Sequence, residues 1–528
     1  MKERDDEKIP ESEGASNGQA RLTRRGFLKT TVGTAALATV AGAALNLSGS
    51  RAEAAPERKL PAKWDEQVDV IVVGSGFAGL AAAAEACAAK ASVLILEKMP
   101  TYGGNSIISG GTYCAWDDKT HMRQRLNLGE DGVEQHKKDT LKGGDFYGVP
   151  ELVDIFVSGA TPGINWLIEE GNVVFRESIN RGGGHSAYRA RKVTEGIGRG
   201  ISDPMKKIAE SRGAKIRLGT EVTWLWRKDA NSPILGVEVA RGKRKSNIRA
   251  KRAVVLASGG FGADKKMRIS FNPSIVPEYN TTNQPGATGE MIRYAQAIGA
   301  DTLQLAFIQQ YPFAEPESGT LDTWASFCFG APGYGGIYVN KQGKRFVSEM
   351  ERRDVCSQAQ IKLGARPSYT IIREAMIPKM RGAEGKQEVE DGLRKGRLIK
   401  ADTIQELAGK INVPADALVE TVEKHNKYLQ ENKDPDFNKP ITKSMMPLNE
   451  GSFYAIAQWP AVHHCMGGLR IDTECRVIDI WGSPIPRLYA AGEIVGGIHG
   501  SNRLGGNAIA DCVVFGRLAG QKAAAEKA

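Results

Sequence analysis

The apolar residues of this chain follow strand and helix patterns, and the clearest of these occupies residues 69–100. The β-branched run Val70–Val73 predicts a buried strand, because such side chains fit the pleated surface of a sheet. A glycine-rich turn follows, and after it comes an alanine-rich stretch of high helix propensity. A second apolar run ends at Glu97 and predicts another strand. Strand, helix and strand in this order predict a parallel βαβ unit.

Other segments extend this pattern along the chain. Residues 251–264 and 487–497 each show a strand pattern that runs into a glycine-rich turn. Residues 288–300 predict a helix that ends in glycine, and the charged stretch 384–432 predicts further helix. Strands that alternate with helices in this way predict an α/β fold.

The glycine-rich turn has the spacing G-x-G-x-x-G at Gly74, Gly76 and Gly79. The first glycine permits a tight turn, the second lets backbone amides approach a pyrophosphate, and the third lets the helix pack on the strand. The helix N-terminus then faces the phosphate charge. Glu97 lies 23 residues after Gly74, where a carboxylate can meet a ribose hydroxyl. The motif alone is weak, but with both strands, the helix and the acid it predicts a dinucleotide site.

Length, charge and cysteine usage narrow the class of protein. A chain of 528 residues is long enough for two or three domains. The net charge of +10 is compatible with an anionic substrate or an acidic redox partner, but more often such a balance reflects only a solvated surface. The lack of a dense basic run with interleaved aromatics argues against nucleic acid. The seven cysteines include no C-x-x-C pair, which disfavours a disulfide scaffold, an iron–sulfur cluster and a c-type haem. If the protein is a redox enzyme, its electrons therefore come from a separate partner.

The N-terminal segment has the features of an export signal. The sequence TRRGFLK at 23–29 precedes a run of apolar and small residues through Leu45, and AEA at 52–54 offers a cleavage site. Paired arginines in this setting predict a twin-arginine signal at 1–54, a linker at 55–64 and a periplasmic protein. The alternative, a membrane anchor, is weaker because the run is rich in Gly, Thr and Ala.

Three later stretches, 335–354, 462–472 and 496–520, carry the most specific motifs. With the glycine-rich motif they resemble the soluble, flavocytochrome-c-type fumarate reductases and their relatives that reduce other 2-enoates. The resemblance covers residues 65–525 and lacks the haem domain of some members. It implies an α/β, Rossmann-like FAD-binding domain in two parts, 65–290 and 446–528, with an inserted α+β capping domain at 291–445. This is the arrangement of the succinate dehydrogenase and fumarate reductase flavoproteins.

The resemblance also implies where FAD contacts the chain. Related respiratory dehydrogenases often attach the flavin to a histidine near residues 103–111, whereas this chain has Asn105 and Ser106 there, so we expect noncovalent FAD and no metal. The expected cofactor contacts are Gly74, Gly76, Phe77, Ala78, Gly79, Glu97, Lys98, Gly104, Asn105, Ser106, Gly110, Gly111, Gly259, Gly260, Gly492, Glu493, Asn507, Ala508 and Ile509.

Three cationic or imidazole side chains are the catalytic candidates. Reduction of an enoate needs a hydride at the β-carbon, a proton at the α-carbon and cations that hold the carboxylate. In the family, the second histidine of H-H-x-M-G-G and the arginine of H-G-x-N-R-L-G-G-N bind that carboxylate, which corresponds to His464 and Arg503 here. The family's proton donor is an arginine after G-K-R-F, which corresponds to Arg353. The bland alternative for each residue is a core hydrogen bond or a surface salt bridge.

The part of the motif that binds a second carboxylate is altered. Fumarate reductases grip it with a histidine before proline and with a Thr-Glu pair, followed by a relay arginine. Here these positions carry Tyr311, Cys328, Phe329 and Pro332. A carboxylate without ionic partners is costly to bury. Tyr311 and Phe329, with Trp324 and Phe327 as further candidates, therefore predict a pocket for an uncharged group, although Tyr311 also fits a purely structural role.

These observations predict a periplasmic FAD-dependent reductase of an aryl-acrylate, methacrylate or urocanate type of substrate. The hydride comes from reduced FAD and the proton from Arg353. The alternatives are a fumarate reductase proper, or a steroid or enone reductase or dehydrogenase on the same fold. The expected partners are a small unsaturated carboxylate and an electron donor, either a periplasmic c-type cytochrome or a membrane quinol-linked protein.

Overall fold

The computed structural model describes residues 58–528 except residues 183, 196 and 276–278. The export signal predicted at 1–54 lies outside the described residues, as do residues 55–57 of the linker. Within the described part, no helix is both long and apolar enough to cross a bilayer.

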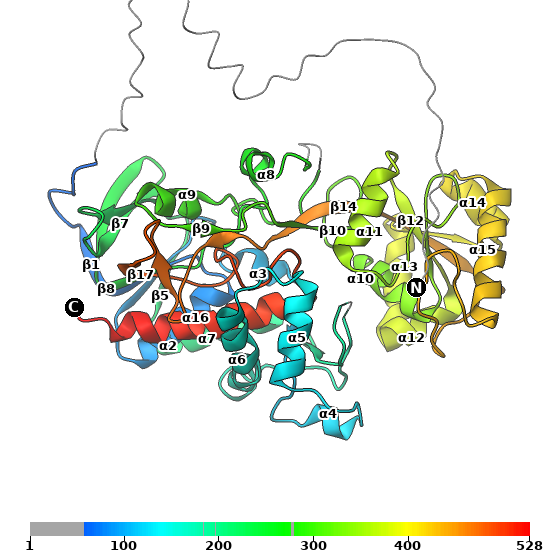
Figure 1. The fold of residues 1–528 in the computed structure, drawn as a ribbon, viewed down its shortest axis with the longest axis horizontal. Helices are drawn as coiled ribbons and strands as arrows, with labels where there is room; N and C mark the ends of the chain where they lie inside the picture. Colours follow the sequence, from blue (N-terminus) through cyan, green and yellow to red (C-terminus); the bar gives the residue numbers. More distant parts are fainter. Residues whose placement is uncertain (1–57, 183, 196, 276–278) are drawn as a thin grey trace, which may run out of the picture. The chain divides into compact units, whose positions relative to one another are not determined.

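An eight-stranded sheet forms the larger part of the fold (Figure 1). Its core order is β16-β17-β8-β1-β2-β5, in which β1, β2, β5, β8 and β17 run parallel. The antiparallel strands β6 and β7 join through β8. The strands are β1 (Glu66–Val73), β2 (Val93–Leu96), β5 (Lys215–Arg217), β6 (Glu221–Arg227), β7 (Ile234–Arg241), β8 (Arg244–Leu256), β16 (Arg476–Ile478) and β17 (Pro484–Ala490). The parallel core confirms the predicted α/β fold.

The helix after the glycine-rich turn, α2 (Phe77–Ala88), packs against the C-terminal helix α16 (Asn507–Ala525), and Figure 1 shows the two side by side. Small residues permit this contact. A Cβ on Gly516 would lie 2.5 Å from the Ala78 carbonyl oxygen, and one on Gly520 would lie 2.2 Å from that of Ala82. The alanine-rich composition of α2 is thus a requirement for its close packing against α16.

A second, antiparallel sheet has the order β10-β14-β12-β11, with β13 also paired to β14. Its strands are β10 (Ile308–Ala314), β11 (Ile337–Val339), β12 (Ser368–Arg373), β13 (Leu398–Ala401) and β14 (Phe453–Cys465). The long strand β14 pairs with β12 and β13 along its first half and with β10 along its second. This register places Gln309 opposite His464 and Tyr311 opposite Ala461.

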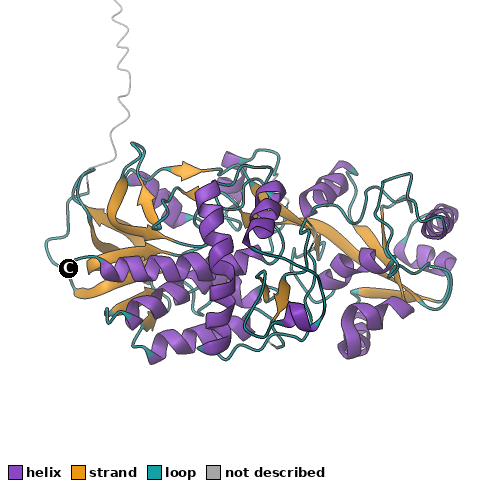
Figure 2. Cartoon of the chain, turned by 60° about the horizontal axis from the view of Figure 1, so that its bottom comes forward, coloured by secondary structure: helices purple, strands orange, loops and turns teal. Residues whose placement is uncertain are grey.

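Helices flank the strands of both sheets (Figure 2). The remaining helices are α3 (Gly104–Ile108), α4 (Met122–Arg125), α5 (Val133–Gly143), α6 (Pro150–Glu169), α7 (Arg199–Ser211), α8 (Lys265–Phe271), α9 (Glu290–Ala297), α10 (Ala325–Gly330), α11 (Arg353–Lys362), α12 (Ile377–Arg381), α13 (Gly385–Arg394), α14 (Ile404–Ile411) and α15 (Ala415–Gln430). Short strand pairs join β3 (Thr112–Cys114) to β4 (Ala190–Lys192), and β9 (Thr302–Leu303) to β15 (Gly468–Leu469).

One expectation from the sequence was wrong: the stretch 384–432 is not helical throughout. Residues 398–401 form β13, because the buried Leu398 and Ala401 pair with β14 and join the core of the second sheet. That core also includes residues 453–456, which lie beyond the predicted boundary at 445. The boundaries of the predicted domains stay a prediction.

Candidate active site

A cleft at the turn between β1 and α2 is lined by much of the predicted cofactor motif. Gly74 adopts φ +102°, and a Cβ there would lie 2.4 Å from the Ala257 carbonyl oxygen. A Cβ on Gly79 would lie 2.0 Å from the Gly74 carbonyl oxygen, so the helix packs on the turn as the motif requires. Because glycine has no side chain, the backbone can make these close approaches and the turn can leave room for a nucleotide.

Eleven of the predicted cofactor residues line this cleft. They are Gly74, Gly76, Phe77, Ala78, Glu97, Lys98, Gly104, Asn105, Ser106, Gly259 and Glu493. The other predicted contacts lie outside the lining. They are Gly79, Gly110, Gly111, Gly260, Gly492, Asn507, Ala508 and Ile509.

Side chains of the cleft are held in place by specific hydrogen bonds. The Glu97 carboxylate accepts from the Ser75 amide at 3.1 Å and from its hydroxyl at 2.6 Å. The Ser106 hydroxyl accepts from the Phe77 amide at 2.9 Å, at the first turn of α2. The Lys98 ammonium pairs with Glu290 at 2.9 Å. The lining therefore presents an acid at the end of β2 and a helix N-terminus, the two groups that a ribose and a pyrophosphate need.

Arg503 is a buried cation with an unsatisfied donor. Its side chain donates from Nη2 to Gln309 Oε1 at 3.0 Å and from Nη1 to the Leu504 carbonyl at 3.0 Å. Among the described residues, no acceptor meets its buried Nε, and no carboxylate lies within ion-pair distance of its guanidinium. Burial, followed by the positive charge of Arg353, lowers the pKa of Arg503 to about 9. The position therefore favours a negatively charged ligand.

His464 lies next to the nucleotide cleft, opposite Gln309 in the β10–β14 pairing. Its Nδ1 is 3.6 Å from Glu493 Oε1, and Glu493 accepts from the Cys465 amide at 2.9 Å. Burial and then Arg503 lower the pKa of His464 well below its usual range, while burial raises the pKa of Glu493 to about 7. Both shifts favour the neutral forms, so the contact is not a strong ion pair, and His464 can act as a neutral hydrogen-bond donor.

Arg353, the first residue of α11, is held by two aromatic rings. Its guanidinium carbon lies 5.0 Å from the centre of the Tyr311 ring and 5.1 Å from that of Phe329. No ion pair joins Arg353 to an acid in the described part of the chain. Its neighbour Arg352 instead pairs with Asp145 at 2.6 Å and with Asp354. Two adjacent arginines are thus in opposite environments, one ionic and one aromatic.

The three candidate catalytic residues come together around one position. A Cβ on Gly505 would lie 3.1 Å from Arg353 Nη2, and Gly505 is two residues from Arg503. The positive charge of Arg353 adds to burial in lowering the pKa of Arg503, and burial raises the pKa of the nearby Glu493 to about 7. The assembly therefore carries excess positive charge that an anionic ligand would neutralise.

The other aromatic candidates lie elsewhere. Phe327 is fully buried under Arg381, whose guanidinium carbon is 5.3 Å from the ring centre, and the Trp324 indole donates to the Glu388 carbonyl. Of the four predicted pocket aromatics, only Tyr311 and Phe329 meet Arg353 in the described contacts. Burial raises the pKa of Tyr311 to about 12, so its phenol stays protonated.

The sequence patterns missed several residues of the site. Gln309 bonds Arg503 and also donates to the Arg503 carbonyl at 2.8 Å. The His463 ring is tilted against the Tyr311 ring, with 5.0 Å between their centres, and its Nδ1 lies 2.7 Å from the Thr282 hydroxyl. Gln309 was marked by being a polar residue in an otherwise apolar strand, and His463 by being one of two adjacent histidines. Only the β10–β14 register shows the partners of both.

Comparisons with known proteins agree with this geometry. A model of the FAD binding domain family matches residues 69–509. A urocanate reductase of Eggerthella lenta is 36% identical, over 94% of this chain and 82% of that protein. An acrylate reductase flavoprotein subunit of Shewanella woodyi is 32% identical, over 94% of this chain and 97% of its own. The open form of a flavocytochrome c3 fumarate reductase superposes with a TM-score of 0.73 at 33% identity, over 88% of this chain and 79% of that one.

A more distant solved structure, a 3-ketosteroid-Δ4-(5α)-dehydrogenase from Rhodococcus jostii, superposes with a TM-score of 0.66 at 24% identity, over 88% of this chain and 98% of its own. At this identity the likeness shows the fold alone. The comparisons indicate FAD as the cofactor, and the glycines, helix N-terminus and terminal acid of the cleft at the β1–α2 turn fit this group.

Proposed function

Because the chain belongs to the FAD binding domain family, alongside the flavocytochrome-type fumarate reductases and the urocanate and acrylate reductases, we propose that it reduces the C=C bond of an α,β-unsaturated carboxylate. The single observation that supports this substrate class is the buried Arg503 with a free Nε donor beside a second cation, Arg353. A substrate carboxylate would supply the missing negative charge and accept the unused hydrogen bond.

The second part of the proposal concerns the other end of the substrate. The ionic groups that would hold a second carboxylate are absent at Tyr311, Cys328 and Phe329. Cys328 is fully buried, whereas Tyr311 and Phe329 present aromatic surface around Arg353. An uncharged group, as in an aryl-acrylate, methacrylate or urocanate type of substrate, fits this surface better than the second carboxylate of fumarate.

In the proposed mechanism, residues of this chain bind the carboxylate and supply the proton, and the cofactor supplies the hydride. FAD, when bound in its reduced form, supplies the hydride for the β-carbon. Arg503 and the neutral His464 hold the carboxylate and stabilise the negative charge that develops on it. Arg353 gives its proton to the α-carbon. An arginine is a very weak acid, so this transfer has to be concerted with hydride addition, when the α-carbon becomes strongly basic.

The aromatic rings around Arg353 explain how the acid is oriented without an ionic relay. Cation–π contacts hold the guanidinium in place without the tight hydrogen bonds that a carboxylate partner would form. A buried glutamate cannot resupply the proton. Burial would raise the pKa of Glu349, but Lys439 and Arg345 lower it to about 2, and Arg345 binds the carboxylate at 2.7 Å. The partly exposed Arg353 and Phe329 make solvent the proton source in this proposal.

The location and the electron donor complete the proposal. The paired arginines at 24–25 and the apolar run after them support export by the twin-arginine route, which cell fractionation would test. The cysteine pattern supports a separate periplasmic cytochrome or a quinol-linked protein as donor. Noncovalent FAD, supported by Asn105 and Ser106, predicts release of the flavin on denaturation.

The adjacent arginines provide a matched test of the proposed acid. Arg353→Gln is expected to lose almost all enoate-dependent oxidation of reduced methyl viologen while it retains FAD and binds the enoate. Arg352→Gln removes the same charge one residue away, from the Asp145 and Asp354 pair, and is expected to keep most of the turnover. Full turnover by Arg353→Gln, or equal losses in both variants, would rule out Arg353 as the acid.

A further inference from the structure

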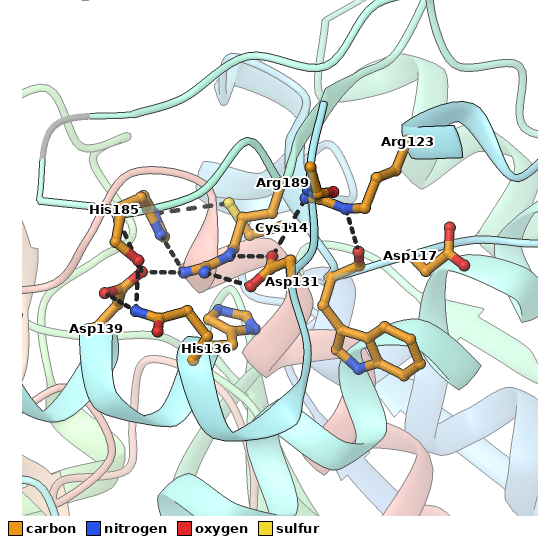
Figure 3. Close-up of polar contacts among 12 residues, drawn as sticks. Cys114, Asp117, Arg123, Asp131, His136, Asp139, His185 and Arg189 are labelled. Carbon is orange, nitrogen blue, oxygen red and sulfur yellow. Dashed lines mark hydrogen bonds and ion pairs between the residues drawn. The ribbon is translucent and has the colours of Figure 1, made fainter. Parts of the chain in front are cut away.

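A layer of buried polar side chains surrounds Arg189 (Figure 3) and reaches the loop that carries Arg503 through hydrogen bonds to the Gly505 carbonyl. Its centre is Arg189, which is fully buried and binds Asp131 through two hydrogen bonds of 2.8 Å and Asp139 at 2.6 Å. Arg123 also contacts Asp131, at 3.3 Å. Two carboxylates therefore fix Arg189 rigidly, and neither its position nor its charge is free to vary.

Arg189 passes this rigidity to His185. Its Nη1 lies 3.0 Å from His185 Nδ1, and His185 Nε2 lies 2.9 Å from the Gly505 carbonyl oxygen. A guanidinium can only donate, so Nδ1 must accept. A carbonyl oxygen can only accept, so Nε2 must carry the proton. The two neighbours thus define the tautomer of His185, which accepts a hydrogen bond from Arg189 and donates one to the Gly505 carbonyl.

Gly505 is the point where this layer meets the reacting groups. Its carbonyl also accepts from the Cys114 thiol at 3.2 Å, and the Cys114 amide donates to the next carbonyl, that of Gly506, at 3.2 Å. On the opposite side, Arg353 approaches so closely that a side chain at 505 would meet its Nη2 at 3.1 Å. Two residues earlier the same loop carries Arg503. The height and tilt of the Gly505 peptide therefore affect both cations.

We propose that His185 is a positioning residue that holds the 503–507 loop, through the Gly505 carbonyl, in the geometry that lets Arg503 and Arg353 share one substrate. The role rests on the proposed function of those two arginines, although the hydrogen bond itself does not depend on it.

A second role for this histidine, as a proton carrier, conflicts with its surroundings. Burial, followed by the charge of Arg189, lowers the pKa of His185 to about 4. The other groups that face it are Asp131 and Asp139, both bonded to Arg189, the neutral His136 at 6.1 Å between ring centres, and the Cys114 thiol, whose pKa burial raises to about 12. The two imidazoles and the thiol are therefore not poised to exchange a proton near neutral pH.

Glutamine and leucine distinguish the two roles of the imidazole. In His185→Gln the amide oxygen can accept from Arg189 and the amide nitrogen can donate to Gly505, whereas His185→Leu can do neither. On the FAD-loaded protein, hydrogen–deuterium exchange of a peptide covering 500–508 is expected to rise about fivefold or more in His185→Leu and to stay close to the parent in His185→Gln. This measurement needs no substrate.

Kinetics with an enoate form the second arm. The substrate is whichever of cinnamate, methacrylate, urocanate and fumarate the parent protein reduces fastest. We expect kcat/KM to fall about fivefold or more in His185→Leu and to be restored in His185→Gln. The pH profile of kcat/KM should be unchanged in His185→Gln. His425 provides the control, because it is equally buried and bonds the Gly335 carbonyl at 2.9 Å in the second sheet's core. His425→Leu should lower the melting temperature without changing exchange at 500–508.

Each other result has a distinct meaning. Unchanged exchange and kcat/KM in His185→Leu would overturn the positioning role. A loss in His185→Gln as large as in His185→Leu, or a shifted pH profile, would overturn it in favour of a titrating imidazole. Failure of the parent protein to reduce any of the four enoates would count against the proposed function, while the exchange arm would still decide the role of His185.

Discussion

Replacement of Arg503 by glutamine should weaken substrate binding without destabilising the protein. The residue is 5% exposed, and its guanidinium donates one hydrogen bond to Gln309 and one to the Leu504 carbonyl, while Nε has no acceptor among the described residues. Charge-assisted hydrogen bonds contribute about 1.5–3 kcal/mol, so KM should rise about 10- to 150-fold. Arg503→Lys keeps the charge but loses the planar fork, and a smaller rise is expected.

Stability separates this interpretation from a structural one. Arg503 is a buried cation without a carboxylate partner in the described residues, so its removal relieves a desolvation penalty, and the melting temperature should stay level or rise. The assay is the oxidation of reduced methyl viologen by a reducible enoate, with FAD content from absorbance and unfolding from calorimetry. An unchanged KM, or a loss of FAD and of melting temperature that parallels the loss of activity, would refute the reasoning.

Three further predictions concern substrate binding at high pH, stability at low pH and the aromatic contacts of Arg353. KM for the enoate should rise by about tenfold per pH unit above pH about 9, because Arg503 loses its proton there in the substrate-free enzyme but keeps it in the enzyme–substrate complex. A KM that stays constant up to pH 10.5 would contradict this. Burial lowers the pKa of His425 to about 3, so below pH ~6.5 the unfolded chain binds a proton that the folded chain does not, and the free energy of unfolding falls on acidification. In urea unfolding at pH 4.5–6, His425→Gln should reduce the pH dependence of this free energy by about 1.4 kcal/mol per pH unit. Tyr311→Leu should lower kcat more than it raises KM, by about 2- to 30-fold for a cation–π contact of 0.5–2 kcal/mol, and an unchanged kcat would show that the ring does not orient Arg353.

Local patterns were sufficient to predict the parallel sheet and the nucleotide cleft. The β1–α2 turn is formed by residues that are close in sequence, and Gly79 faces Gly74 and Val72 within this unit, whereas Gly74 faces Ala257 just after β8. The C-terminal helix was less obvious, because its glycines at 516 and 520 have a purpose only once α2 is placed against them.

The candidate site depends on contacts between distant segments, and sequence reasoning recovered it only in part. Motifs indicated Arg353, His464 and Arg503, but not that Tyr311 and Phe329 would stack on Arg353 instead of lining a separate pocket. The motifs assigned no role to Gln309 or to His185. Their roles come from the β10–β14 register and from a hydrogen-bonded layer that spans residues 114–505, neither of which is visible in local periodicity.

The central claim, a carboxylate held by Arg503 and an uncharged group at the altered end, is tested most directly by a substrate panel. With reduced methyl viologen as donor, kcat/KM would be compared for cinnamate, methacrylate, urocanate, fumarate and a steroid enone. We predict that an enoate with an uncharged end is the best substrate and that fumarate is poorer by about 100-fold, which corresponds to about 3 kcal/mol for an unpaired second carboxylate. Fumarate or the carboxylate-free steroid enone as the best substrate would contradict the account.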